Sequence, residues 1–253
     1  MLSVISEKFK SFKDELDSYV LGFEHMGEKF DNQHRNAIRL FPLGDITINI
    51  KSFKIPIIFN QIAYRFLRKG KAQRSFEYGN RLLSLGIKTP EPIAYYEFPT
   101  LLLFKKSYYI SEHLEYDYTY RSLMDDFDIP NYEEILRAFT RFTFELHEKG
   151  VHFFDHSPGN TLIKKVHGGY EFYLVDLNRM KFEPLDYETR IKNFARLTIH
   201  KSMVEIMSDE YAKCIRKSYE EVFNLMWQNT LDFQEKYHRQ KRRNKKLKFW
   251  KKG

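Results

Sequence analysis

The chain has 253 residues, of which 42% are hydrophobic and 30% are charged. These values are ordinary for a globular protein and exclude a chain that is disordered throughout. The length is sufficient for one large domain or for two closely joined lobes. The single cysteine, Cys214, excludes an internal disulfide framework and favours a reducing cytosol. The longest apolar runs, 55–59 and 101–104, are far shorter than a membrane span, so we expect neither secretion nor a transmembrane anchor.

The net charge of +8 comes from the C-terminal end of the chain. Ten of the 42 Lys and Arg residues, and no Asp or Glu, lie in 236–253, which leaves 32 basic and 34 acidic residues in 1–235. Basic residues mixed with Leu247, Phe249 and Trp250 favour an anionic membrane surface. A solubilising tail and a nucleic-acid-binding segment would use the same charges. Because the rest of the chain contains no recognisable nucleic-acid module, we expect no nucleic-acid partner.

The first 114 residues predict a β-rich lobe that contains one main helix. Apolar residues at helical spacing predict a short amphipathic helix over 5–20. Alternating residues predict strands, and a helix over 71–85 should stop at Gly86. The predicted strands cover 37–43, 45–53, 93–97, 101–104 and 107–114.

The second half of the chain has a helical pattern. One helix is predicted over 132–149, a hairpin over 161–166 and 170–177, and helical structure throughout 187–237. The sequence therefore predicts an α+β protein with a β-rich N-lobe over 1–114, a helical C-lobe over 115–235 and a basic tail over 236–253.

Three polar residues around the predicted hairpin carry the clearest chemical signal. Asp155 follows the helix over 132–149, Asn160 comes five residues later, and Asp176 lies at the end of the hairpin. Phosphoryl transfer needs one carboxylate to accept a hydroxyl proton and two oxygen ligands for Mg²⁺. Each residue alone is also a common turn former. Their order and spacing together indicate phosphoryl transfer more specifically.

Around these residues the sequence resembles the protein-kinase-like superfamily, and within it the lipopolysaccharide kinases of the Kdo/WaaP family, which phosphorylate inner-core sugars. The resemblance rests on matched segments and implies a bilobal kinase-like fold that uses ATP and Mg²⁺. It also implies that Asp155 is the catalytic base and that Asn160 and Asp176 bind the metal. The matched segments are Lys51-Ser-Phe-Lys54, 71–77, 86–93, Asp155-x-Ser-Pro-Gly-Asn160 and Asp176-Leu-Asn-Arg179.

The same resemblance assigns the nucleotide-binding residues. Lys54 is expected to bind phosphate and to be oriented by Glu77, with Lys51 as a rival for the lysine role. A surface salt bridge of little energetic value is the alternative explanation for the pair of Lys54 and Glu77. The Gly-rich loop is degenerate, so side chains are expected to replace it. The other expected cofactor contacts are Arg35 and Asn36 in that loop, and Glu112, His113 and Leu114 at the adenine.

Departures from the protein-kinase pattern favour a small-molecule or glycolipid acceptor over a peptide. Phe154 precedes the base, and no Ala-Pro-Glu segment follows the metal-binding Asp. Arg179 and Lys181 are the expected acceptor-binding residues, because Arg and Lys bind carboxylate and phosphate groups well. Arg190 and Arg196 fit either this role or a solvated helix face. The cluster His147, His152 and His156 lacks the ligand spacing of a zinc site.

The sequence therefore predicts an ATP-dependent kinase of a sugar hydroxyl, on Kdo or on heptose, in the lipopolysaccharide inner core. We expect a cytoplasmic protein that lies peripherally at the inner membrane surface and contacts the glycolipid acceptor there. An atypical RIO-like protein kinase and a catalytically inactive kinase-fold module are the alternatives.

Overall fold

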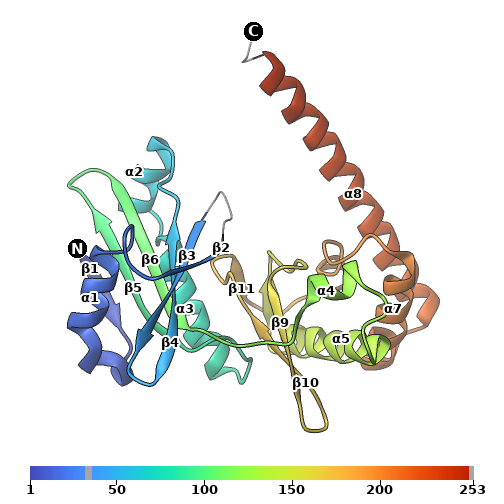
Figure 1. Cartoon of the computed structure of the whole chain (residues 1–253). Helices are drawn as coiled ribbons and strands as arrows, with labels where there is room; N and C mark the ends of the chain where they lie inside the picture. The colour runs from blue at the N-terminus through green and yellow to red at the C-terminus, as the bar shows by residue number, and fades with distance from the viewer. Residues whose placement is uncertain (32–35, 251–253) are drawn as a thin grey trace. The chain divides into compact units, whose positions relative to one another are not determined.

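The computed structural model describes residues 1–31 and 36–250 and divides the chain into two compact units (Figure 1). Unit 1 contains Met1–Glu115 and Tyr173–Arg179, and unit 2 contains Tyr116–Phe172 and Met180–Gly253. The segment 173–179 falls within the predicted C-lobe. In the structure this segment bonds to unit 1: the Leu174 amide donates to the Lys88 carbonyl, and the Thr89 hydroxyl donates to the Leu174 carbonyl.

Unit 1 is built on a six-stranded antiparallel sheet with the order β1-β5-β6-β4-β3-β2. The strands predicted over 37–43, 45–53 and 93–97 are confirmed. The separate strand predicted over 101–104 is wrong, because Thr100 and Leu103 close a turn with a 2.7 Å backbone hydrogen bond between β5 and β6. The strands are β1 (Leu2–Ile5), β2 (Glu28–Asp31), β3 (Asn36–Leu43), β4 (Ile46–Phe53), β5 (Pro92–Pro99) and β6 (Phe104–Glu112).

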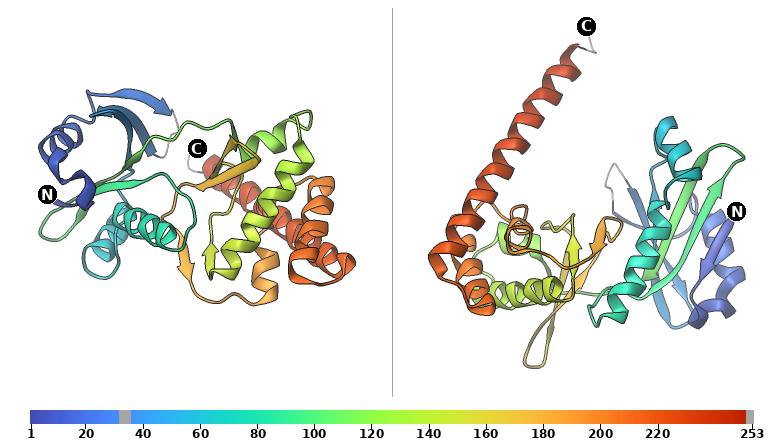
Figure 2. Two further views of the ribbon diagram at one scale, coloured as in Figure 1. Left: turned by 90° about the horizontal axis from the view of Figure 1, so that it is seen from below. Right: turned by 180° about the vertical axis from the view of Figure 1, so that it is seen from behind.

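Helices cover both faces of this sheet (Figures 1 and 2). The alternation of side chains along β4 determines which of its residues contact the helices on each face. Ile48 and Ile50 are buried in a cluster with residues of η1 (Glu7–Phe12) and α1 (Lys13–Leu21). Phe53 has the opposite orientation and packs against α3 (Lys71–Ser84). Since side chains alternate along a strand, Lys51 lies on the same face as Phe53. A further short helix, α2 (Ile58–Phe66), precedes α3.

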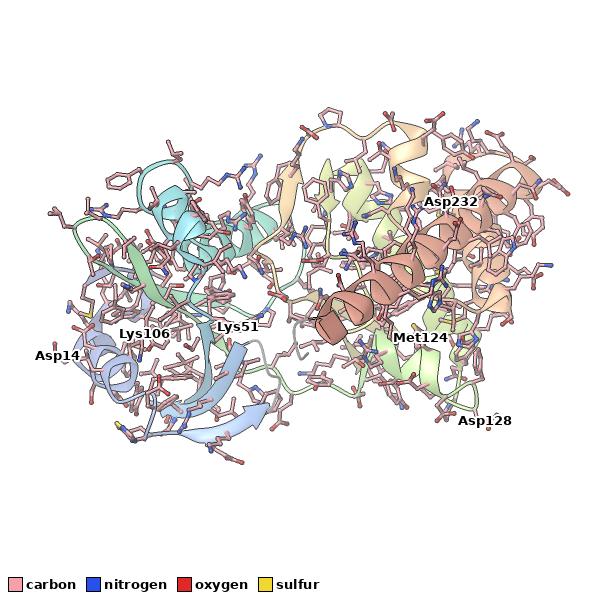
Figure 3. The ribbon with its side chains drawn as sticks, turned by 90° about the horizontal axis from the view of Figure 1, so that it is seen from above. Asp14, Lys51, Lys106, Met124, Asp128 and Asp232 are labelled. Atoms are coloured by element: carbon pink, nitrogen blue, oxygen red, sulfur yellow. The ribbon has the colours of Figure 1, made fainter. Side chains whose placement is uncertain are left out.

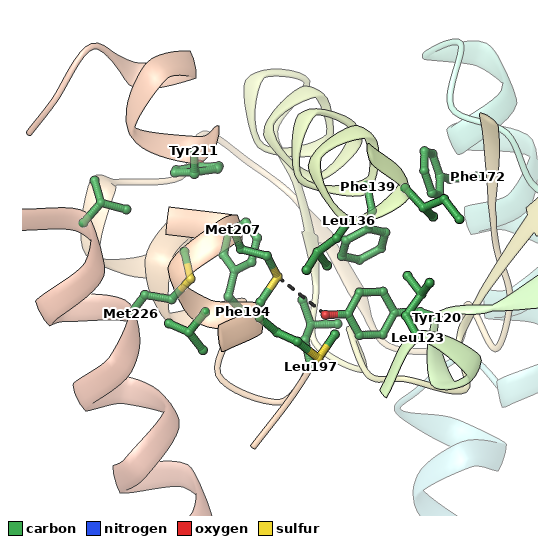
Figure 4. Close-up of a cluster of buried hydrophobic side chains, with 14 of the residues drawn as sticks. Tyr120, Leu123, Leu136, Phe139, Phe172, Phe194, Leu197, Met207, Tyr211 and Met226 are labelled. Atoms are coloured by element: carbon green, nitrogen blue, oxygen red, sulfur yellow. Dashed lines mark hydrogen bonds between the residues drawn. The ribbon is translucent and has the colours of Figure 1, made fainter. Parts of the chain in front are cut away.

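Unit 2 is organised around α5 (Tyr132–Glu148), which confirms the helix predicted over 132–149. Its apolar side packs against α7 (Lys201–Ile215), which in turn packs against α8 (Tyr219–Trp250). The three helices share one buried cluster, where the Tyr120 hydroxyl points to the Met207 sulfur (Figure 4). The predicted hairpin is confirmed as β9 (Thr161–Val166) and β10 (Gly169–Leu174). The smaller elements are β7 (Tyr118–Thr119), α4 (Tyr120–Asp125), β8 (Val151–Phe153), β11 (Met180–Phe182) and α6 (Tyr187–Lys192).

The continuous helical structure predicted over 187–237 is wrong in two places. The segment 193–200 separates α6 from α7, and Arg216 ends α7 in the left-handed conformation with φ 56°. The helix α8 then continues to Trp250 and so includes most of the basic tail, and Figure 1 shows it projecting from the other helices of unit 2. Within the described residues, no helix combines the length and apolar character needed to cross a bilayer.

Candidate active site

The sheet of unit 1 brings Lys51 to Asp176. The Lys51 Nζ atom donates a hydrogen bond of 2.7 Å to Asp176 Oδ1, and Asn178 Nδ2 donates to the same oxygen at 2.7 Å. Lys51 projects from β4 on the α3 side of the sheet (Figure 3). Asp176 has φ 58°, a region that residues other than glycine seldom occupy and that is concentrated at functional sites. The segment that carries Asp176 is therefore held in one specific conformation by groups of unit 1.

The expected pair of Lys54 and Glu77 is not formed. Lys54 lies one residue beyond the end of β4, is exposed, and has no ion pair with any described residue. Glu77 instead accepts hydrogen bonds from Lys69 at 2.7 Å and from Gln73 at 3.0 Å. The physical reason is the two-residue period of β4, which turns Lys51 toward the α3 face and leaves Lys54 past the last paired residue. Lys51, the rival in the sequence analysis, takes the position beside the carboxylate.

A second lysine, Lys71 at the start of α3, lies beside the same group. Both lysines approach the same aromatic ring: Lys71 Nζ is 5.9 Å and Lys51 Nζ is 5.5 Å from the centroid of the Phe53 ring. Burial lowers the pKa of Lys71, while the charge of Asp176 acts in the opposite direction and the charges of Lys51 and Arg179 add to the lowering. Lys71 has no ion pair with a described residue. Two lysines beside one carboxylate leave a local excess of positive charge that suits an anion.

The expected adenine-binding segment lies at the end of β6. Its amides are partly used inside unit 1, since Glu112 N donates to Glu91 O and His113 N donates to Thr47 O. The His113 ring also contacts Phe30, edge to face, at 5.0 Å. The backbone amide of Leu114 has no backbone partner within the described part of the chain. Arg35 and the side chain of Asn36, the other expected cofactor contacts, lie outside the described residues.

In unit 2, Asp155 is fixed by an arginine that follows α6. Arg196 Nη1 donates hydrogen bonds of 2.8 Å to Asp155 Oδ1 and to the Phe154 carbonyl. The guanidinium group of Arg196 in turn lies over the Phe233 ring of α8, 5.7 Å from its centroid. From the sequence, Arg196 fits either acceptor binding or a solvated helix face. The structure gives it a third role, since it orients the carboxylate of the expected base.

The loop around Asp155 rests on the core of unit 2. The His156 side chain is fully buried, stacks on Phe139 of α5 and shares a 3.2 Å hydrogen bond with Thr143. Burial lowers the pKa of His156 to about 3 and that of His147 to about 4, so both rings are neutral at physiological pH. His147 contacts Tyr211 and Asn193 instead of approaching His156 as a co-ligand. Among the described residues, no three His, Cys, Asp or Glu side chains are grouped as a metal site requires.

The remaining expected site residues have mixed surroundings. Asn160 Nδ2 donates to the Asp155 carbonyl at 2.8 Å, which leaves its side-chain oxygen for another ligand. Asn160 directly precedes β9, and Asp176 comes two residues after β10, the neighbouring strand. Lys181 forms an exposed ion pair of 3.3 Å with Glu183, and Arg190 binds Glu148 and the Leu185 carbonyl. These contacts give Arg190 a structural explanation that does not involve an acceptor.

The donor set agrees with magnesium and a nucleotide. Mg²⁺ prefers carboxylate and amide oxygens and is bound by one or two protein ligands together with phosphate oxygens. Asp176 in unit 1 and Asn160 in unit 2 each carry an oxygen of this type. The excess of positive charge at Lys51 and Lys71 suits phosphate groups.

Comparison of the sequence with protein-family models and with curated proteins gives no match. Among solved structures, the chain is similar to one described as WaaP in complex with acyl carrier protein, with a TM-score of 0.65 and 15% identity over 94% of this chain and 99% of that chain. WaaP gives its name to the kinase family that the motifs resemble. Since 900 solved chains match, the fold by itself selects no single activity. The similarity confirms the predicted fold class: the chain has the bilobal kinase-like fold of WaaP.

Proposed function

We propose that this chain is a kinase that transfers phosphate from ATP to a sugar hydroxyl of Kdo or heptose in the lipopolysaccharide inner core. The observation that carries the proposal is the 2.7 Å pair of Lys51 and Asp176 on a fold shared with WaaP. A lysine on the central strand of a kinase-like sheet, paired with the carboxylate that follows the hairpin, is an arrangement suited to binding phosphate and metal.

Each residue then has a definite task. Bound Mg²⁺-ATP supplies the phosphoryl group and a divalent charge that offsets the charge on the phosphates. Lys51 and Lys71 would donate to phosphate oxygens, and the oxygens of Asp176 and Asn160 would be the protein ligands of the metal. The free amide of Leu114 is the group that we assign to the adenine. Lys71 replaces part of the positive environment that a Gly-rich loop provides in other kinases.

Asp155 accepts the proton of the attacking sugar hydroxyl. A base must hold its carboxylate at hydrogen-bond distance from that proton and in one orientation. The two hydrogen bonds from Arg196 restrict Asp155 in this way, because one fixes the carboxylate and the other fixes the backbone just before it. Arg196 is therefore a positioning residue, which acts through Asp155.

The inner-core acceptor carries carboxylate and phosphate groups, for which we propose Arg179 and Lys181 as contacts. The basic residues of 236–253 would attract the protein to an anionic membrane surface, where such a lipid resides. The helix α8 carries the basic residues from Lys236 to Arg243 on a projecting helix of unit 2. Its exposed residues from Lys236 to Asn244 leave this surface available for lipid headgroups.

Transfer of labelled phosphate from ATP to purified Kdo–lipid A and to a heptosylated acceptor tests the proposal. We expect Asp155→Ala and Asp176→Ala to lower kcat by at least ~10³-fold. Asp128→Ala, which removes an exposed carboxylate in the loop between α4 and α5, is the matched control and should retain activity. Full activity of either site variant contradicts the assignment. Labelling of proteins in place of lipid would favour the RIO-like alternative, and binding of Mg²⁺-ATP without any transfer would favour an inactive module.

A further inference from the structure

The helix α2 of unit 1 presents its apolar side to solvent. Gln61 is only 9% exposed and donates a 2.8 Å hydrogen bond to the Pro56 carbonyl, and Tyr64 packs its ring against Phe104 of β6. The opposite face of the helix contains Phe59, Ile62 and Phe66, and Phe59 is 80% exposed. A surface helix normally buries its apolar stripe and exposes its polar one. In α2 this orientation is reversed.

A neighbouring turn extends the same apolar area. Arg65 Nε donates to the Thr100 carbonyl at 3.1 Å, which joins the end of α2 to the turn between β5 and β6. That turn carries Leu101, 83% exposed, and Leu102, and α2 is followed directly by Leu67, 81% exposed. Both views show α2 and the turn at the same end of unit 1 (Figures 1 and 2). We call this area the α2 surface: Phe59, Ile62, Phe66, Leu67, Leu101 and Leu102.

The charges around the α2 surface favour an anionic partner. The sequence from Ile46 to Phe76 contains no Asp or Glu. Arg65 lies in α2 and Arg68 follows it directly after Leu67, and Lys54 precedes the helix in the same stretch. Aromatic and aliphatic side chains bordered by cations are the combination that enters the headgroup region of an anionic bilayer, because the apolar groups leave water and the cations meet lipid phosphates. An exposed apolar area of several adjacent side chains on a soluble protein marks such an interaction site.

We propose that the α2 surface inserts into the interfacial region of a membrane that contains anionic lipids. This surface belongs to unit 1 and is separate in sequence from the basic residues at 236–253. It provides apolar contact, whereas the tail provides charge. Two signals of these two kinds together give stable attachment where either alone gives weak and reversible binding.

A label at one position of the full chain tests the proposal without interference from the tail. In a Cys214→Ser background, Phe59→Cys is labelled with an environment-sensitive fluorophore, and Leu21→Cys on α1, which replaces another exposed apolar residue, is the matched control. With vesicles of phosphatidylglycerol and phosphatidylcholine, we expect a blue shift at position 59 and none at position 21. Vesicles of phosphatidylcholine alone should give a smaller shift.

Co-sedimentation of the unlabelled protein gives a second readout. The double variant Phe59→Ser/Leu101→Ser should partition at least ~10-fold less to the mixed vesicles, because transfer of large apolar side chains out of water contributes a free energy of this order to binding. The control Leu21→Ser should partition like the parent chain. Far-UV circular dichroism verifies that the variants are folded. Binding to vesicles without a shift at position 59 would overturn the proposal. A shift induced by acyl carrier protein and not by vesicles would overturn it equally, since the partner would then be a protein.

Discussion

The ammonium group of Lys51 donates a 2.7 Å hydrogen bond to the carboxylate of Asp176, although the two residues are 125 positions apart. The contact connects the central strand β4 with the segment that follows β10. The phosphate-binding role that the family resemblance assigns to Lys54 is not supported by a contact of this kind, since Lys54 is exposed beyond the end of β4. The two lysines are three positions apart, and we therefore expect the same substitution to impair activity at Lys51 and to have little effect at Lys54.

Replacement of Lys51 by Met should lower kcat/KM for ATP by at least ~100-fold, because an interaction with the transferring phosphoryl group is lost. Lys54→Met is the matched control and should remain within ~3-fold of the parent enzyme. Initial rates at several ATP concentrations measure both. The reverse order of the two variants would return the phosphate-binding role to Lys54.

Arg196 should affect turnover and not nucleotide binding. Arg196→Met removes both hydrogen bonds to the Asp155 region and should lower kcat by ~10–100-fold with little change in KM for ATP. Arg196→Lys keeps the charge but loses the forked geometry, so a partial recovery is expected. Arg141→Met, which removes an exposed ion pair with Glu210, is the control. A variant that raises KM alone would show that Arg196 does not act through the base.

Gly79 sets the distance between α3 and the segment of Asp176. A Cβ atom there would lie 2.7 Å from Pro92 Cγ and 3.3 Å from a methyl group of Leu177, the residue after Asp176. Gly79→Ala should therefore lower the free energy of unfolding by ~1–3 kcal/mol, as overpacking does elsewhere. Gly159→Ala meets only the far end of Arg121, at 3.6 Å, and should change stability little. Urea unfolding compares the two, and equal stabilities would contradict the close packing.

Glu97 should make stability depend on pH. Its side chain is 9% exposed, and burial raises its pKa from 4.5 to about 7, while a hydrogen bond from the backbone N–H of Gln73 opposes the shift. Between these pH values the folded state keeps a proton that the unfolded state releases. The contribution is therefore fully present below pH 4.5 and is lost as the pH rises toward 7, by ~3 kcal/mol in total.

The variant Glu97→Gln cannot lose a proton and should remove this part of the pH dependence. Its free energy of unfolding relative to the parent chain should rise between pH 5 and pH 7.5. Glu115→Gln, at an exposed position outside the strands, is the control. A constant difference between Glu97→Gln and the parent chain across this range would show that Glu97 titrates normally.

Local sequence patterns predicted most of the long elements. The alternation of Ile46, Ile48 and Ile50 predicts β4, and the one-sided apolar spacing of 132–149 predicts α5. The helix α2 was missed, because its dense apolar residues follow a proline and show no single buried stripe. The strands β1 and β2 were missed as well, since edge strands of four residues carry little periodicity.

The sequence by itself identified the candidate residues for the chemistry, because the order and spacing of Asp155, Asn160 and Asp176 lie within a short stretch of chain, where local motifs are informative. Only the tertiary structure decided which cations contact the carboxylates of Asp176 and Asp155. Lys51 rather than Lys54 faces Asp176, and Arg196 reaches Asp155 over 41 positions. Such pairings depend on which face of a strand meets α3 and on where the chain turns after α6. No local pattern contains that information, because it arises only when the elements pack.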